Sequence, residues 1–209
     1  MPLHKIIHIN ENTTAYFWHI TEDVTSLFRA VSLRDTSLFR LEGMKSEEHQ
    51  KGFLAVRILL QHLGYTDYDL TYDEAGKPHL SDGKHISISH SHEFSCICIS
   101  DELMGIDLEK LKEKTLKIAP RFMEVKHLEN LTTSEQIEKA TVIWGVKESI
   151  FKIKNEKGIS FPEHIFEAEF DLKEGKCEAE LHFNNQIENF QIQFYNVEAY
   201  IFVCAFPKK

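Results

Sequence analysis

Alternation of apolar and polar residues is the clearest pattern along this chain. Short segments rich in β-branched and aromatic residues alternate in this way, as strands with one buried face do. They lie at 4–9, 14–20, 68–73, 85–89, 95–100, 103–109, 164–171, 177–183, 189–195 and 198–205. Strands are therefore predicted in both halves of the chain.

A helical spacing of apolar residues marks two longer segments. The first, 46–63, is opened by Ser46, with Glu48 nearby, and is closed by Gly64. The second, 133–154, follows Thr132 or Thr133 with Glu135 and Gln136 close behind, which is typical of a capped helix start. Shorter helices are predicted over 22–30 and 115–123.

Each half of the chain contains a long helix followed by a group of strands, and the pattern changes near residues 101–105. We therefore expect an α+β fold made of two similar halves, 1–102 and 103–209, in a pseudo-twofold arrangement.

Composition narrows the class of protein. The chain has 209 residues, 42% of them hydrophobic, and a formal net charge of −9. This content excludes intrinsic disorder, and the charge disfavours nucleic acid as a partner. No apolar run is long enough for a membrane span, so a cytoplasmic protein that binds no membrane is expected. Cys96, Cys98, Cys177 and Cys204 form no CxxC pair, which favours reduced, buried thiols over a metal site.

Two carboxylates stand on one face of the strand at 103–109. Asp107 and Glu109 alternate with Ile106 and Leu108, so the acids share one face. Adjacent acids beside apolar residues favour a divalent cation with oxygen ligands, above all Mg²⁺. The alternative is a solvated strand edge.

The helix at 133–154 has an unusual second face. Ile143, Val146, Ile150 and Ile153 form its apolar stripe, and the other side carries Trp144, Lys147, Glu148, Phe151 and Lys152. This side is expected to pack against a structure that also needs charge, although Glu148 and Lys152 alone could be a surface pair.

A turn and a strand in the first half carry groups suited to phosphate. Gly76, Lys77 and Pro78 form the turn, and Ser89 and His90 end the strand. Adjacent strand residues point to opposite faces and no nucleophile-elbow motif is present, so catalysis by a Ser-His pair is disfavoured. Phosphate binding through charge-assisted hydrogen bonds is the functional alternative to ordinary surface histidines.

Taken together and in this order, the GKP, ISISHS, GIDLEK and WGVKESIFK blocks resemble those of the 4′-phosphopantetheinyl transferases of the longer, surfactin-synthetase-activating type. Asp107 and Trp144 are 37 positions apart, roughly the family's spacing. Gly145 stands where the family usually has Ser, Cys or Ala, which weakens the helix slightly.

The resemblance implies the family fold, a monomer, and an active site between the two halves. It also implies an enzyme that transfers phosphopantetheine from coenzyme A to a serine of an apo acyl, peptidyl or aryl carrier protein, releasing 3′,5′-ADP, the holo-[acyl-carrier-protein] synthase reaction. Its residue roles are as follows. Asp107, Glu109 and Glu148 would hold Mg²⁺; Glu148 would be the general base; Lys147 and Lys152 would contact phosphates; and Lys77, Pro78, Ser89 and His90 would bind the nucleotide end.

The family also has basic residues that hold the 3′-phosphate of coenzyme A. Their candidates here are Arg34, Arg40, Lys51 and Arg57, and none of the four is assigned to this role.

Residues 110–126 carry six lysines and arginines against two glutamates. Because the carriers are acidic, this segment is the expected docking surface, with Lys110, Lys112, Lys114, Lys117 and Arg121 in contact. A solvated helix is its alternative. Two other functions stay open, a different Mg²⁺-dependent phosphoryl or nucleotidyl transferase and a carrier- or nucleotide-binding module without activity.

Overall fold

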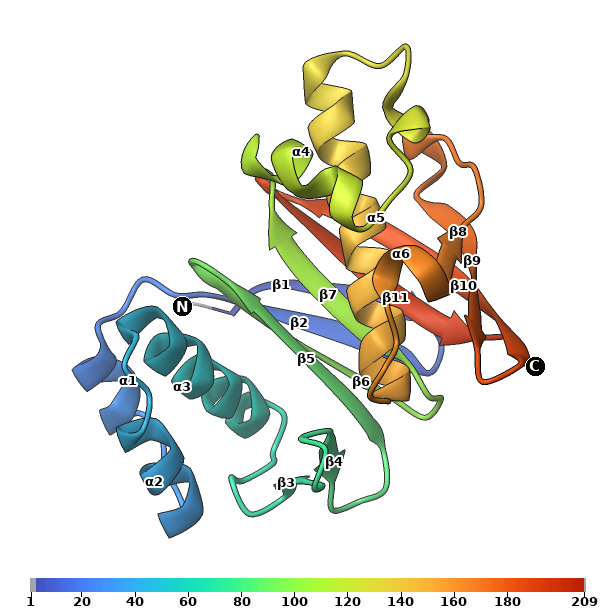
Figure 1. Ribbon diagram of the computed structural model, residues 1–209. Helices are drawn as coiled ribbons and strands as arrows, with labels where there is room; N and C mark the ends of the chain where they lie inside the picture. Colours follow the sequence, from blue (N-terminus) through green and yellow to red (C-terminus); the bar gives the residue numbers. More distant parts are fainter. Residues whose placement is uncertain (1–2, 209) are drawn as a thin grey trace. The chain divides into compact units, whose positions relative to one another are not determined.

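The computed structural model describes residues 3–208 of the chain. These residues form two compact units, one that ends at residue 102 and one that begins at residue 103 (Figure 1). Each unit has its own sheet and its own long helix. An α+β composition is therefore confirmed for each unit.

The N-terminal unit is built on a four-stranded antiparallel sheet of order β1-β2-β6-β5. Its strands are β1 (Leu3–Asn10), β2 (Thr13–His19), β5 (His85–Ser91) and β6 (Phe94–Ser100), and β3 (Leu70–Tyr72) with β4 (Pro78–Leu80) forms a separate ribbon. Its helices are α1 (Val24–Arg29), α2 (Asp35–Glu42) and α3 (Glu47–His62). Helix α3 packs on the sheet, and the Ser46 side chain accepts a hydrogen bond from the His49 backbone N–H at its start.

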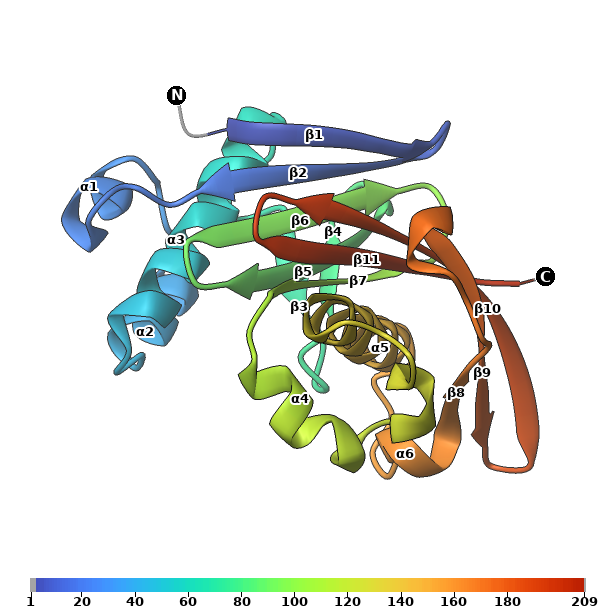
Figure 2. The same cartoon turned by 90° about the horizontal axis from the view of Figure 1, so that it is seen from above.

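The C-terminal unit has a five-stranded antiparallel sheet of order β7-β11-β10-β9-β8. Its strands are β7 (Gly105–Lys110), β8 (Ile165–Glu167), β9 (Lys176–Phe183), β10 (Gln186–Val197) and β11 (Tyr200–Pro207). Its helices are α4 (Lys114–Ile118), α5 (Thr133–Lys154) and α6 (Phe161–His164), with 3₁₀ turns at Ala119–Arg121, Val125–Leu128 and Leu172–Glu174. Figure 2 shows the strands curving around α5, which is seen nearly end-on.

Three strands of each sheet share one order of pairing. In each unit a leading strand, β2 or β7, pairs with the last strand of the unit, which in turn pairs with the strand before it. In each unit the long helix comes between the leading strand and these later strands in the sequence. The expected similarity of the halves is therefore present in strand order, and the pseudo-twofold relation stays a prediction.

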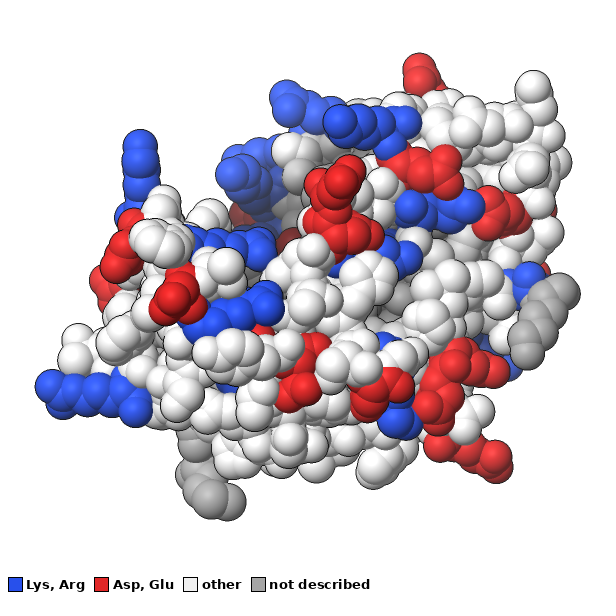
Figure 3. Space-filling model, turned by 90° about the horizontal axis from the view of Figure 1, so that it is seen from below, with Lys and Arg blue, Asp and Glu red and all other residues white. Residues whose placement is uncertain are grey.

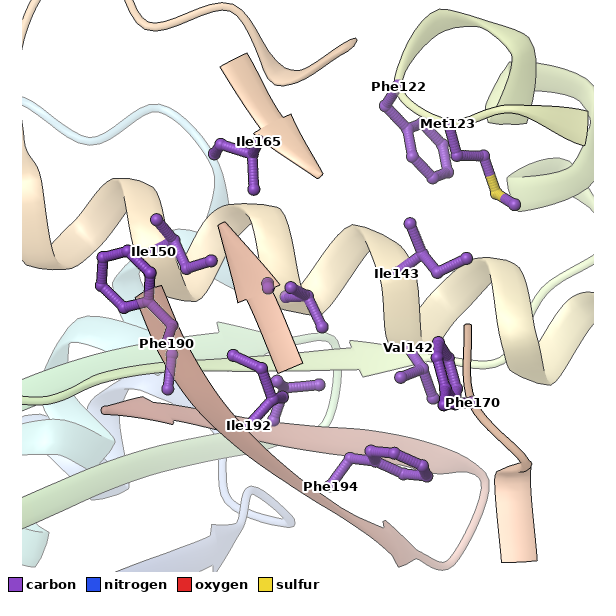
Figure 4. Close-up of a cluster of buried hydrophobic side chains, with 14 of the residues drawn as sticks. Phe122, Met123, Val142, Ile143, Ile150, Ile165, Phe170, Phe190, Ile192 and Phe194 are labelled. Carbon is purple, nitrogen blue, oxygen red and sulfur yellow. The ribbon is translucent and has the colours of Figure 1, made fainter. Parts of the chain in front are cut away.

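The core of the C-terminal unit lies between α5 and its sheet (Figure 4). The predicted stripe of Ile143, Val146, Ile150 and Ile153 is buried, and it meets aromatic side chains of β10 such as Phe190. The helix starts with a complete capping box between Thr132 and Glu135. A capped start and a continuous apolar stripe explain why its predicted bounds are correct.

Some expected elements differ from the structure. The predicted helix at 115–123 stops after Ile118 and continues as a 3₁₀ turn, because Pro120 has no N–H for a helical hydrogen bond. The strand expected at 164–171 pairs only over Ile165–Glu167, and its end leads to a 3₁₀ turn capped by Asp171. Helices α2 and α6 and strand β4 are short and were not predicted.

The cysteines fit the sequence expectation. Cys96, Cys98 and Cys204 are buried and Cys177 is partly buried, with no disulfide within the described part of the chain. Over residues 3–208, none of the helices combines the length and the apolar run that a membrane span requires.

Candidate functional site

Strand β7 carries the two predicted acids. Asp107 pairs in register with Val203 of β11, and Glu109 pairs with Ile201. Ile106 and Leu108 are fully buried, Asp107 is only 4% exposed, and Glu109 is half-buried. A solvated strand edge is therefore the wrong interpretation for Asp107, whose carboxylate is enclosed by protein.

Two glycines bring helix α5 close to this strand. A Cβ atom added to Gly105 would lie 2.1 Å from the Ser149 carbonyl oxygen, and one added to Gly145 would lie 2.5 Å from Val203 Cγ2. No side chain fits at either contact, so glycine permits the close approach. The approach also places position 145 beside Asp107, because a Cβ at Gly145 would be 3.8 Å from the Asp107 Cβ.

Lys152 of α5 binds the acidic strand directly. Its Nζ donates to Asp107 Oδ1 at 2.9 Å and to the Ile106 carbonyl oxygen at 2.9 Å. Its side chain is 29% exposed, against 5% for the side chain of Asp107. The strand motif and the helix motif therefore meet in one ion pair, formed by residues far apart in the sequence.

Glu148 lies one helical turn before Lys152 and interacts electrostatically with both Lys152 and Asp107. Burial raises the pKa of its carboxyl group, the Asp107 carboxylate raises it further, and Lys152 opposes the shift. The carboxylates of Asp107 and Glu148 and the amine of Lys152 are therefore close together and partly shielded from solvent. Such a group can hold a cation or accept a proton from a bound molecule near neutral pH.

Part of the predicted metal-ligand set is brought together. Asp107 and Glu148 interact electrostatically, and Glu109 follows on the same strand. Within residues 3–208, no group of three or more His, Cys, Asp or Glu side chains is arranged to hold a metal ion. The three-carboxylate set stays a prediction, and Asp107 with Glu148 is the pair whose donor chemistry suits Mg²⁺.

Lys147 occupies a different environment from the one the sequence predicts. Its side chain is 3% exposed, and its Nζ donates to Glu167 Oε2 at 2.7 Å and to the Ile165 carbonyl oxygen at 2.5 Å. Burial lowers the pKa of the Lys147 amine, and Glu167 counteracts this. On this helix face, Lys147 is therefore paired with a charged residue of β8, Glu167. A contact between Lys147 and phosphate stays a prediction.

Aromatic side chains complete this helix face. Trp144 makes edge contacts with Phe122 and Phe161, at ring-centroid distances of 5.0 and 5.6 Å. Phe151 contacts Phe161 in the same manner at 6.0 Å. The two aromatics of α5 therefore serve packing. Sequence reasoning missed Glu167 and Phe161, because no pattern links them to a helix earlier in the chain.

The residues predicted to bind phosphate in the N-terminal unit lie in the turn before β4, at the start of β4 and on β5. The turn before β4 is fixed by Asp73, whose Oδ1 accepts from the backbone N–H of Ala75 at 3.0 Å and of Lys77 at 2.9 Å. Pro78 then starts β4 rather than lying within the turn. Lys77 is therefore presented from a backbone held in one conformation.

Ser89 and His90 point to different surroundings on β5. Ser89 is buried and His90 is exposed, as expected for neighbours on a strand. The His90 ring packs on α3 at Gly52, where an added Cβ would lie 2.9 Å from His90 Cδ2. Gly52 is a residue that sequence reasoning missed.

The candidates for the 3′-phosphate of coenzyme A already have other contacts. Arg57 forms a buried ion pair with Asp67 at 3.2 Å, and Lys51 pairs with Glu47 at 3.0 Å. Arg40 lies over the Tyr72 ring at 4.6 Å, and Arg34 donates to the Leu70 carbonyl oxygen. Arg57 is therefore a structural residue here.

Basic side chains crowd the segment that follows β7. Lys112, Lys114, Lys117 and Arg121 are exposed. Lys110 lies over the Tyr200 ring, and Lys126 pairs with Glu124. Figure 3 shows several basic side chains along the upper edge of the view. Although the chain is acidic overall, this surface is locally basic.

Comparisons with known proteins agree with the motifs. Residues 103–204 match the family model of the 4′-phosphopantetheinyl transferase superfamily. The chain is 32% identical over 121 residues to the 4′-phosphopantetheinyl transferase gsp of Aneurinibacillus migulanus. The matched region covers 55% of this chain and 51% of that protein.

Two Bacillus subtilis proteins give similar matches. The 4′-phosphopantetheinyl transferase Sfp of strain 168 is 32% identical over 105 residues, 48% of this chain and 46% of that protein. The transferase ffp is 30% identical over 124 residues, 57% of this chain and 54% of that protein. The matches span about half the length of these relatives, and the resemblance drawn from the motifs is confirmed.

Proposed function

We propose that this chain, whose residues 103–204 belong to the 4′-phosphopantetheinyl transferase superfamily, transfers 4′-phosphopantetheine from coenzyme A to a serine of an apo carrier protein. In this reaction the serine oxygen bonds to the phosphorus that carries the pantetheine arm. The bond from that phosphorus to the bridging oxygen breaks, and 3′,5′-ADP leaves with the bridging oxygen. The serine proton goes to a base on the enzyme.

One observation carries the proposal. The two family motifs meet where Lys152 Nζ contacts Asp107 Oδ1 at 2.9 Å, with Glu148 close enough for Asp107 to raise its pKa. Phosphoryl transfer is catalysed mainly by positioning and by stabilising negative charge. The buried Asp107 and the partly buried Glu148, beside the Lys152 amine, provide groups for both tasks.

The donor set fits Mg²⁺, a hard cation that prefers carboxylate oxygens. Asp107 and Glu148 would hold it, with Glu109 as the proposed third ligand; the raised pKa of Glu148 is the observation that favours a cation here. When bound, Mg²⁺ would neutralise charge on the pyrophosphate.

Glu148 is proposed as the general base. A base works best when its pKa lies near the working pH, and burial with a neighbouring carboxylate moves this glutamate in that direction. Lys152 is proposed to contact the phosphates, because its side chain is partly exposed and its amine already lies at the acidic group. Lys147 is also proposed to contact a phosphate, through the third N–H of an amine that already donates to Ile165 and Glu167.

The nucleotide end of coenzyme A is proposed to bind through Lys77, Pro78, Ser89 and His90. The support is the fixed backbone at Lys77 and the exposed ring of His90. The carrier is proposed to dock on Lys110, Lys112, Lys114, Lys117 and Arg121, a basic surface that starts one residue after Glu109. The expected monomeric state stays a prediction.

Incubation with coenzyme A, Mg²⁺ and an apo acyl carrier protein separates the three functions that the sequence leaves open. The proposal predicts equimolar 3′,5′-ADP and phosphopantetheine-modified carrier. A different phosphoryl or nucleotidyl transferase would consume the nucleotide substrate without modifying the carrier serine. A binding module would retain coenzyme A or the carrier and release no product.

A further inference from the structure

The N-terminal unit has a hollow in which none of the residues assigned above takes part. It lies between the end of β2, helix α1 and helix α3, and its volume is about 390 Å³. The buried side chains of Trp18, Leu27 and Ile58 line it. This volume is at the lower end of the range for small-molecule pockets, roughly 300–1,000 Å³.

Trp18 gives this hollow a specific polar feature. The residue is 3% exposed, and its indole Nε1 has no hydrogen-bond partner among the described residues 3–208. A buried N–H donor without an acceptor is unfavourable and uncommon in folded proteins. The indole nitrogen is itself buried, so an added molecule can satisfy this donor only once a neighbouring side chain moves aside.

The rim of the hollow restricts what enters. Glu22, Gln61 and His62 are at the opening, and the described lining residues include no lysine or arginine. Gln61 is held by a hydrogen bond from its Nε2 to the Ala30 carbonyl oxygen at 3.2 Å. The Glu22 carboxylate, with no lysine or arginine among the described lining residues, disfavours anions.

His62 is the rim residue whose ring contacts the indole of Trp18. Its ring centroid lies 5.3 Å from that of Trp18, at an angle of 42°, and the residue is exposed in the last turn of α3. An exposed ring can change rotamer at little cost. Rotation of His62 would open a path toward the indole ring.

We propose that this hollow binds a small uncharged molecule with one apolar ring and one acceptor oxygen, such as an aromatic amide. The ring packs on Leu27 and Ile58, and the oxygen accepts a hydrogen bond from Trp18 Nε1–H. This site is independent of the transferase proposal, because its residues belong to neither the acidic strand nor α5.

The indole N–H resonances of the full chain provide a direct test. The sequence has two tryptophans, so Trp18 reports on the hollow and Trp144 serves as an internal control in the other unit. Trp18→Phe assigns the two signals. Titration with benzamide is expected to move the Trp18 signal saturably and leave the Trp144 signal in place.

Matched probes and variants separate the proposal from nonspecific binding. Toluene has the ring without the oxygen and is expected to bind about tenfold more weakly, and benzoate is expected not to bind unless Glu22→Gln removes the rim charge. Ala30→Phe, which fills the hollow from an exposed position, is expected to abolish the benzamide shift; Ala30→Leu is the milder variant if Phe disturbs folding. An unmoved Trp18 signal, equal responses to toluene and benzamide, or a full response in a folded Ala30 variant would each overturn the proposal.

Discussion

Gly145 on α5 and Val203 on β11 are complementary in size. A methyl group at position 145 would lie 2.5 Å from Val203 Cγ2 and 3.2 Å from Val203 Cβ, and 3.8 Å from the Asp107 Cβ. Asp107 is the register partner of Val203. The packing of Gly145 against Val203 therefore sets the distance between α5 and β7, the strand that carries Asp107.

Gly145→Ala is predicted to destabilise the protein, although helix propensity alone favours Ala by about 1 kcal/mol. The clash with a rigid β-branched side chain costs about 1–3 kcal/mol and is the larger effect. Urea unfolding of Gly145→Ala, Val203→Ala and the double variant measures the coupling. Recovery of stability in the double variant relative to the sum of the singles is expected, and strict additivity would contradict this packing account.

Glu148→Gln is predicted to raise the melting temperature at pH 8. Because burial and Asp107 raise the pKa of Glu148 in the folded state, its ionised form costs stability above that pKa. This cost disappears as the pH falls through the raised value toward the ordinary one, where the folded state binds the extra proton.

The gain from Glu148→Gln should therefore shrink as the pH falls from 8 toward the ordinary glutamate value of 4.5. Glu129→Gln, at an exposed glutamate of the same unit, is the control and should show no such trend. A gain that does not vary with pH, or a loss of stability at pH 8, would rule out the electrostatic environment inferred for Glu148.

The buried pair of Lys147 and Glu167 is predicted to be structural. Their side chains are 3% and 4% exposed, and removing one partner of such a pair leaves a buried charge, at a cost of about 3–5 kcal/mol. Glu167→Gln should lower the free energy of unfolding, and adding Lys147→Met should restore part of it.

Kinetics of the folded Glu167→Gln variant separate packing from phosphate binding by Lys147. If Lys147 acts only in the pair, the KM for coenzyme A should stay near the wild-type value. A marked change in that KM with little loss of stability would instead place Lys147 at the substrate.

The sequence predicts the elements of this fold better than the contacts of its site. Alternating strands and the capped helix at 133–154 are local patterns, and they appear with nearly the expected bounds. Short elements such as α2 bury few side chains, Ser37 and Leu41, so they leave a weak pattern. Pro120 was the visible signal for the early end of α4.

The site motifs were recognisable because their charged residues are clustered in the sequence. Their partners were not, because Glu167 is 20 residues from Lys147 and Ile106 is 46 residues from Lys152. The buried state of Asp107 also depends on tertiary packing, since α5 covers the strand only where Gly105 and Gly145 allow it. A close approach of helix and strand at a glycine leaves no distinct sequence pattern.

Reversing the charge of three lysines in residues 110–126 is predicted to impair carrier binding without affecting coenzyme A binding. Lys112→Glu, Lys114→Glu and Lys117→Glu together should slow association and raise the KM for an acidic carrier, with the KM for coenzyme A little changed. The wild-type rate should fall as salt rises, because screening weakens long-range attraction.

The matched control changes the same net charge elsewhere. Lys5→Glu, Lys173→Glu and Lys176→Glu replace exposed lysines outside this segment and should leave the KM for the carrier near the wild-type value. Equal values for the two triple variants at low salt would remove residues 110–126 from the docking surface.

Intact mass of an apo acyl carrier protein after incubation with coenzyme A and Mg²⁺ tests the central claim most directly. The wild-type chain is predicted to add the mass of phosphopantetheine to the carrier, and a carrier with its serine replaced by alanine should stay unmodified. Asp107→Asn and Glu148→Gln, each shown to be folded, should lose nearly all of this activity. No mass gain with the wild-type chain, or near-normal conversion by either variant at saturating Mg²⁺, would contradict the account.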